Sequence, residues 1–83
     1  MKYAVFNRIH THDLVFEFKQ PVEFFINDGI VSCDTYNISF EMITPPDRFY
    51  AKVADEFYNL YKDNNLPDVD VIPESEFSLC KNN

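Results

Sequence analysis

The chain has 83 residues, with fourteen acids against seven Lys and Arg and a formal net charge of −7 at pH 7. At this length we expect one compact domain over residues 1–80, with residues 81–83 frayed at the C-terminus. The charge argues against direct nucleic-acid binding, because such affinity comes mainly from Lys and Arg. A single glycine excludes the Gly-rich loops that hold phosphates.

Aromatic residues dominate the apolar part of the composition, with nine Phe and five Tyr. Each buried aromatic side chain removes roughly 150–250 Å² from water. A core led by Phe is therefore expected to stabilise this small fold without disulfides. Aromatic side chains that the core does not enclose would form a surface that binds a protein partner or a second copy of the chain.

The cysteines and the N-terminal residues indicate a cytoplasmic protein. Cys33 and Cys80 form no C-x-x-C motif, and small secreted domains usually use more cysteines. A single bridge between the two is the alternative. Asn7 and Arg8 interrupt the first apolar run, so no signal-peptide core forms, and no stretch is long enough to cross a membrane.

Strand patterns begin at the N-terminus. Residues 2–9 are rich in Tyr, Val, Phe and Ile, and residues 14–20 alternate apolar with polar side chains, the period of a half-buried strand. The polar residues 10–13 are expected to join the two strands as a hairpin. Pro21 interrupts the pairing, and residues 22–26 resume the alternation.

A second hairpin is predicted at Asn27-Asp28-Gly29, where Asp-Gly favours a tight turn with positive φ. Residues 30–33 form the return strand. After a bend or bulge at 34–37, residues 38–42 alternate again. They form either a further strand or an extension of the preceding one.

One amphipathic helix is predicted over about residues 45–63. Thr44 is the expected N-cap, Pro45 takes the first helical position, and Asp47 has the capping-box spacing. Apolar positions recur at helical spacing from residue 49 to residue 61. Asn64 or Asn65 is expected to end the helix in a left-handed conformation, and Pro67 prevents its continuation.

The remaining residues complete the predicted architecture. Residues 68–72 alternate acids with apolar side chains, as in a short edge strand. Residues 73–79 are expected to pack through Phe77 and Leu79. The predicted fold class is therefore α+β, a four- to five-stranded antiparallel sheet with the helix packed on one face.

Candidate catalytic and metal-binding groups are weak. His10, His12 and Asp13 carry suitable metal donors, and in an extended strand the two imidazoles would project from the same side. A further ligand cannot be assigned, so a solvated turn is the preferred interpretation. Asp34 would raise the pKa of the Cys33 thiol rather than activate it. We predict no enzyme activity, no metal and no cofactor.

Two windows of the chain contain acids but no Lys or Arg, residues 20–47 and 63–80. Alternation places Glu23 away from Phe24, and Glu41 away from Phe40. The sheet would then display carboxylates on its outer face while the helix covers the inner one. Carboxylates on a rigid surface attract a basic surface of another protein and compete with nucleic acid for it.

By composition, the chain resembles small acidic accessory products of bacterial viruses, many of which block host defence enzymes that handle nucleic acid. This resemblance implies a non-enzymatic inhibitor of the anti-restriction or anti-CRISPR kind, acting in the host cytoplasm. The expected partner-binding residues are Glu23, Asp28, Asp34, Glu41, Tyr36, Tyr58, Asp68, Asp70, Glu74 and Glu76. The alternatives are a homodimeric assembly subunit and a metal-dependent enzyme using His10, His12 and Asp13.

Overall fold

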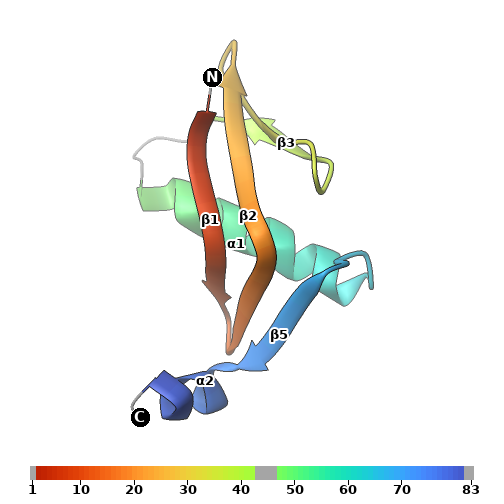
Figure 1. The fold of residues 1–83 in the computed structure, drawn as a ribbon. Coiled ribbons are helices and arrows are strands. Elements are labelled where there is room, and N and C mark those ends of the chain that lie inside the picture. The colour runs from red at the N-terminus through yellow and green to blue at the C-terminus, as the bar shows by residue number, and fades with distance from the viewer. Residues whose placement is uncertain (1, 43–46, 82–83) are drawn as a thin grey trace.

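The computed structural model describes residues 2–42 and 47–81 and has the predicted α+β fold (Figure 1). The elements are, in chain order, β1 (Lys2–Thr11), β2 (Leu14–Asn27), β3 (Ile30–Cys33), β4 (Ile38–Glu41), α1 (Asp47–Lys62), β5 (Val69–Pro73) and α2 (Glu74–Lys81). The strands of this described part form one sheet of five strands, all paired antiparallel.

Strand β2 is the centre of the sheet. Along one edge it pairs with β1, while its other edge is shared by two strands. There β5 pairs with residues 14–18 of β2, and β3 pairs with residues 25–27. Strand β4 continues the sheet beyond β3. Residues 19–24 of β2 therefore have no strand partner on the second edge.

The predicted hairpin turn at Asn27-Asp28-Gly29 is confirmed by the backbone. Asp28 and Gly29 have φ angles of 53° and 76°, the two positive values that a tight two-residue hairpin requires. A second turn, in which Asn37 has φ of 56°, reverses the chain between β3 and β4. The alternative that residues 38–42 extend the preceding strand is wrong, because β3 and β4 pair antiparallel.

Pro21 interrupts the pairing but does not end the strand. The register between β1 and β2 shifts between the pairs Phe6–Val22 and Arg8–Glu17, so β2 has extra residues opposite a single residue of β1. Proline has no N–H to donate to a ladder and is tolerated at such bulges. The long strand bends partway along its length (Figure 1).

Helix α1 ends as the sequence predicts. Asn64 adopts φ of 59°, and the Asn65 N–H donates to the Leu60 carbonyl at 2.8 Å. This six-to-one bond past a left-handed residue is the Schellman motif, which satisfies a carbonyl left free at the helix end. The predicted cap at Thr44 and the first-turn Pro45 lie outside the described residues.

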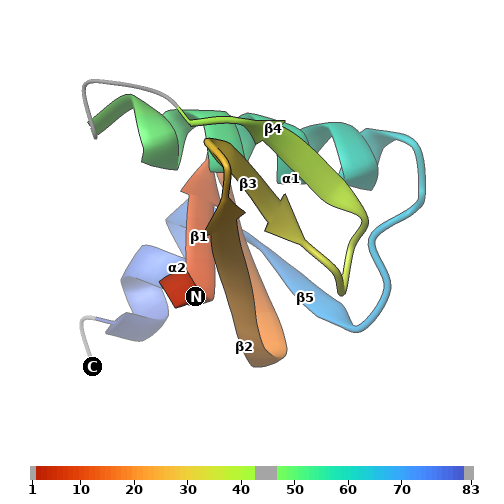
Figure 2. The same cartoon turned by 90° about the horizontal axis from the view of Figure 1, so that it is seen from above.

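Aromatic rings join α1 to the sheet. The Phe24 ring of β2 lies 5.8 Å from Phe6, 6.5 Å from Phe40, 6.1 Å from Phe49 and 6.2 Å from Phe57, measured between ring centroids. Phe49 and Phe57 belong to α1, which runs along one side of the strands (Figure 2). The buried cluster comprises Ile9, Phe16, Phe18, Val22, Phe24, Val31, Cys33, Ile38, Phe49, Val53, Ala54 and Phe57.

The C-terminal segment forms a second helix, α2, which the sequence pattern did not indicate. Its first turn carries Glu74 and Glu76, acids that complement the positive end of a helix dipole. Phe77 packs through its ring against His10, with 5.6 Å between centroids, and below the Arg8 guanidinium at 4.7 Å. Neither helix of the described part is long and apolar enough to cross a membrane.

Candidate functional site: the fork between β3 and β5

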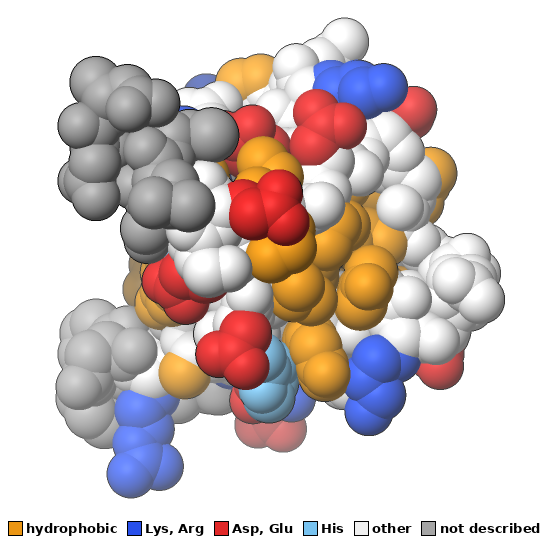
Figure 3. Space-filling model, turned by 90° about the horizontal axis from the view of Figure 1, so that it is seen from below, with side chains coloured by type: hydrophobic (Ala, Val, Ile, Leu, Met, Phe, Trp, Pro, Cys, Tyr) orange, Lys and Arg blue, Asp and Glu red, His pale blue; other side chains and the backbone are white. Residues whose placement is uncertain are grey.

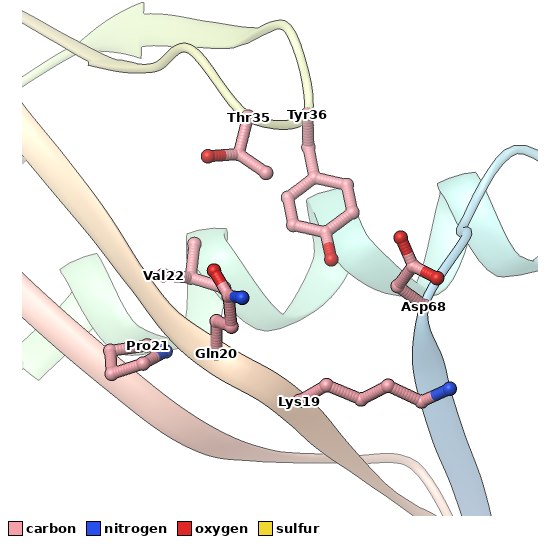
Figure 4. A pocket seen from close by; sticks show the side chains of 7 residues that line it. All are labelled: Lys19, Gln20, Pro21, Val22, Thr35, Tyr36 and Asp68. Carbon is pink, nitrogen blue, oxygen red and sulfur yellow. The ribbon is translucent and has the colours of Figure 1, made fainter.

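A pocket of about 360 Å³ lies where β3 and β5 diverge along the open edge of β2. We call it the fork; its lining residues are Lys19, Gln20, Pro21, Val22, Thr35, Tyr36 and Asp68. The first four come from β2, and the other three come from turns (Figure 4). The fork exists because β2 is longer than either strand on that edge, so its middle is left uncovered.

Tyr36 ties the two turns together. Its hydroxyl donates a hydrogen bond to the Pro67 carbonyl at 3.2 Å, and its ring lies 5.3 Å from that of Phe57. Partial burial raises the pKa of the Tyr36 phenol, and the negative charge of Asp68 raises it further. The Asp68 carboxylate is therefore close enough to act on the phenol oxygen, as Figure 4 shows.

Cys33 lies behind the fork as a free, buried thiol. The prediction that it is a small core residue is confirmed, since it belongs to the buried cluster. Burial raises the pKa of the thiol above its usual 9.0, despite backbone hydrogen bonds from Tyr36 and Thr35 that lower it, and nearby Asp34 raises it further. A thiol held neutral in this way is a poor nucleophile.

These two shifts predict a loss of stability in alkali. Both groups ionise more readily in the unfolded chain, so their contribution is fully present below pH 9 and is lost as the pH rises through the folded-state pKa values. Urea titrations at intervals from pH 7 to pH 11 should show a free energy of unfolding that falls above pH 9. Cys33→Ala with Tyr36→Phe should flatten that fall, and an equally steep fall in this variant would contradict the assignment.

Two of the predicted partner-binding acids use their charge within the chain. Glu23 lies 3.3 Å from the Lys2 ammonium, and Glu74 lies 3.6 Å from Nδ1 of His10. Such exposed pairs stabilise a fold only weakly, but the Lys2 ammonium reduces the negative charge that Glu23 offers to a partner. Glu76 is exposed on α2, away from the fork.

The other predicted acids form two groups. Asp28 and Glu41 lie at the β2–β3 turn, where the Met42 N–H donates to the Gly29 carbonyl at 2.8 Å. The other three are Asp68, which lines the fork, Asp34, which precedes the lining residue Thr35 in the chain, and Asp70 on β5. All three are exposed and without an ion pair to any described residue. The second group includes one acid from the first sequence window and two from the second.

The two predicted aromatic anchors do not lie together. Tyr36 lines the fork, whereas Tyr58 of α1 contacts the His12 ring at 3.9 Å and the Lys62 ammonium at 5.4 Å. The expectation that both imidazoles project from one side is wrong. His10 contacts α2 and His12 contacts α1, because the turn residue His12 has φ of 53° and breaks the strand alternation.

The underside of the molecule, viewed in Figure 3, shows acidic side chains spread around a central apolar area, with a histidine among them. Within the described part of the chain no three His, Cys, Asp or Glu side chains are grouped as metal ligands. The acids therefore form a dispersed surface, and the fork is the place where residues of both windows line one pocket.

Sequence reasoning missed five of the seven residues that line the fork, Lys19, Gln20, Pro21, Val22 and Thr35. The available signal was Pro21, which marks a stretch where ladder pairing is weak. That signal does not specify which strands flank the stretch. No protein-family model, curated protein or solved structure matches this chain.

Proposed function

We propose that the protein is a non-enzymatic binding module whose acidic surface around the fork engages a basic surface of another protein. One observation carries this proposal: the Tyr36–Pro67 hydrogen bond joins the turn after β3 to the turn before β5. Asp34 and Asp68 thereby stand on adjoining turns, although the sequence separates them widely. Lys19 is the single base in the lining of the fork.

The physical basis is long-range attraction. A chain with formal charge −7 repels nucleic acid and speeds its encounter with a basic protein. Carboxylates attached to turns that are hydrogen-bonded together keep their spacing, so little conformational entropy is lost when a partner binds. In its narrower form, the proposal is that the partner is a nucleic-acid-handling enzyme, blocked in the manner of anti-restriction or anti-CRISPR inhibitors.

The test compares two variants that remove equal charge. The fork variant is Asp34→Asn with Asp68→Asn and Asp70→Asn, and the control is Asp28→Asn with Glu41→Gln and Asp63→Asn. Immobilised wild-type protein is used to capture partners from lysate with a salt gradient, and the affinity of each purified partner is then measured by calorimetry. The fork variant loses three exposed charge pairs with the partner, each worth roughly 0.2–1 kcal/mol. We therefore expect it to bind about ten-fold more weakly than wild type.

The control variant should bind within about three-fold of wild type, since screening weakens the effect of distant charges. Equal losses in both variants would show that only net charge matters, and the site would be misplaced. For a captured nucleic-acid enzyme, displacement of its DNA or RNA by wild-type protein supports the narrower form. Simultaneous binding of both contradicts the narrower form.

Self-association is the second candidate, favoured by a different observation. On the sheet face away from α1, Val5 and Ile30 are 44% and 39% exposed, and Phe25 is half-buried beside them. A second copy of the chain would cover this apolar area. Sedimentation velocity at low and high salt tests this candidate. A dimer that persists in high salt and is lost in Val5→Lys supports self-association. A monomer under both conditions excludes it.

A further inference from the structure

The fork combines an apolar wall with hydrogen-bond acceptors. The Tyr36 ring lies on the same side of β2 as the buried Val22, whereas the neighbouring Pro21 points to the other side of the strand (Figure 4). The Tyr36 hydroxyl uses its hydrogen as a donor to Pro67, so its oxygen lone pairs remain as acceptors. The Asp68 carboxylate adds acceptors that have no ion-pair partner among the described residues.

The charge around the fork favours a cationic guest. Asp68 and Lys19 are the acid and the base in the lining of the fork, and the exposed Asp34 and Asp70 are close in sequence to the lining residues Thr35 and Asp68. The Lys19 side chain extends from β2 across to β5, with its ammonium beside β5 rather than against the Tyr36 hydroxyl (Figure 4). Its side chain is exposed, and because a lysine ammonium is carried on a flexible four-carbon stem, it can move aside when a second cation enters.

The shape of the fork favours guanidinium over ammonium. A guanidinium is planar, stacks on aromatic rings and donates in a fixed geometry that matches a carboxylate. The Tyr36 ring supplies the face for stacking, and the Asp68 carboxylate supplies the paired acceptors. At about 360 Å³, the pocket has the size of the smallest ligand sites.

We propose that the fork receives one arginine side chain of the partner protein, which Asp68 and Tyr36 hold together. This inference rests on the proposed function, because it names the group by which a basic partner would be recognised. It also assigns different weights to the acids. Asp68 contacts the guest directly, whereas the carboxylates of Asp34 and Asp70 only attract it electrostatically from a greater distance.

The probe is N-acetyl-arginine amide, added to isotope-labelled protein and followed by amide NMR shifts. A ligand of this size should bind with a Kd on the order of 1 mM, with saturable shifts at Val22, Thr35 and Tyr36. N-acetyl-lysine amide should bind about five-fold more weakly because it lacks the planar donor pair. Lys19→Gln should tighten arginine binding by about two- to three-fold.

Two variants carry the decisive comparison. Asp68→Asn should weaken arginine binding by about ten-fold, since it removes the charge from a charge-assisted hydrogen bond. Asp28→Asn is the matched control: both aspartates are exposed turn residues with positive φ, 58° at Asp68 and 53° at Asp28. Asparagine tolerates that conformation, so neither variant should perturb the fold, and Asp28→Asn should bind as wild type.

The outcomes separate this inference from the proposed function. Shifts that do not saturate, or an equal loss in Asp68→Asn and Asp28→Asn, would overturn the arginine site. If the fork triple variant nevertheless weakens capture of a basic partner, the binding function stands without a specific arginine pocket. If arginine binds at the fork but no protein partner depends on the fork acids, the pocket stands and the proposed function is wrong.

Discussion

Phe24→Ala is expected to lower the free energy of unfolding by about 3–5 kcal/mol. Phe24 is fully buried and its ring meets four others, two of them on α1. Removing it leaves a cavity between sheet and helix that rigid aromatic neighbours cannot fill. Since small domains are stable by only about 5–15 kcal/mol, most of the stability of this 83-residue chain would be lost. Urea unfolding followed by circular dichroism measures the change.

The next residue along the strand provides the control. Phe25 has the same side chain on the opposite face of β2, where it is only half-buried. Phe25→Ala should cost less than about 1.5 kcal/mol, because less apolar area returns to water. Similar losses in the two variants would mean that the sheet faces are assigned incorrectly.

Val53→Asp is expected to abolish cooperative folding. Val53 is fully buried on the sheet-facing side of α1, and none of the described ion pairs offers a cation to a carboxylate there. A buried, unpaired charge costs several kcal/mol, comparable with the whole stability of a small domain. Thermal unfolding should lose its sigmoidal transition, and the far-ultraviolet spectrum should show less helix.

The same substitution at an exposed position of α1 shows how much of the loss comes from burying the charge and how much from the poorer helix propensity of aspartate. Ala51 is exposed, so Ala51→Asp should cost less than about 1 kcal/mol, mainly from the lower helix propensity of aspartate. Val53→Ala should cost about 2 kcal/mol, a measurable loss that keeps the chain folded. A cooperative transition of wild-type size in Val53→Asp would show that α1 is not part of the core.

Local patterns predicted most of the elements because each depends on neighbouring residues. The strand at Leu14–Phe18, the Asp28–Gly29 turn and the Asn64 helix end all agree with the structure, although Val15 is fully buried and breaks the expected alternation of burial. The prediction that Glu23 and Phe24 face opposite sides is also confirmed, since Phe24 is buried and Glu23 is partly exposed. A strand alternates its side chains whatever its partners are.

The sites were less predictable, because they depend on residues far apart in the chain. The sequence shows that Glu23 and Glu74 are acidic, but not that Lys2 and His10 pair with them. It also does not show that β5 takes the same edge of β2 as β3. That shared edge creates the fork and brings Lys19 and Pro21 into a site with Tyr36 and Asp68.

By itself, the sequence determined the fold class and the charge pattern. It specifies an acidic α+β domain whose phenylalanines form a core and whose acids include two stretches without Lys or Arg. Hydrophobic periodicity and turn chemistry are local, so they are read directly from the residues. Only the tertiary structure decided where the two windows meet, because strand pairing and one hydrogen bond from Tyr36 bring residues of both windows to a common pocket. Pairing between distant segments is set by the packing of the whole core, and no short stretch of residues specifies it.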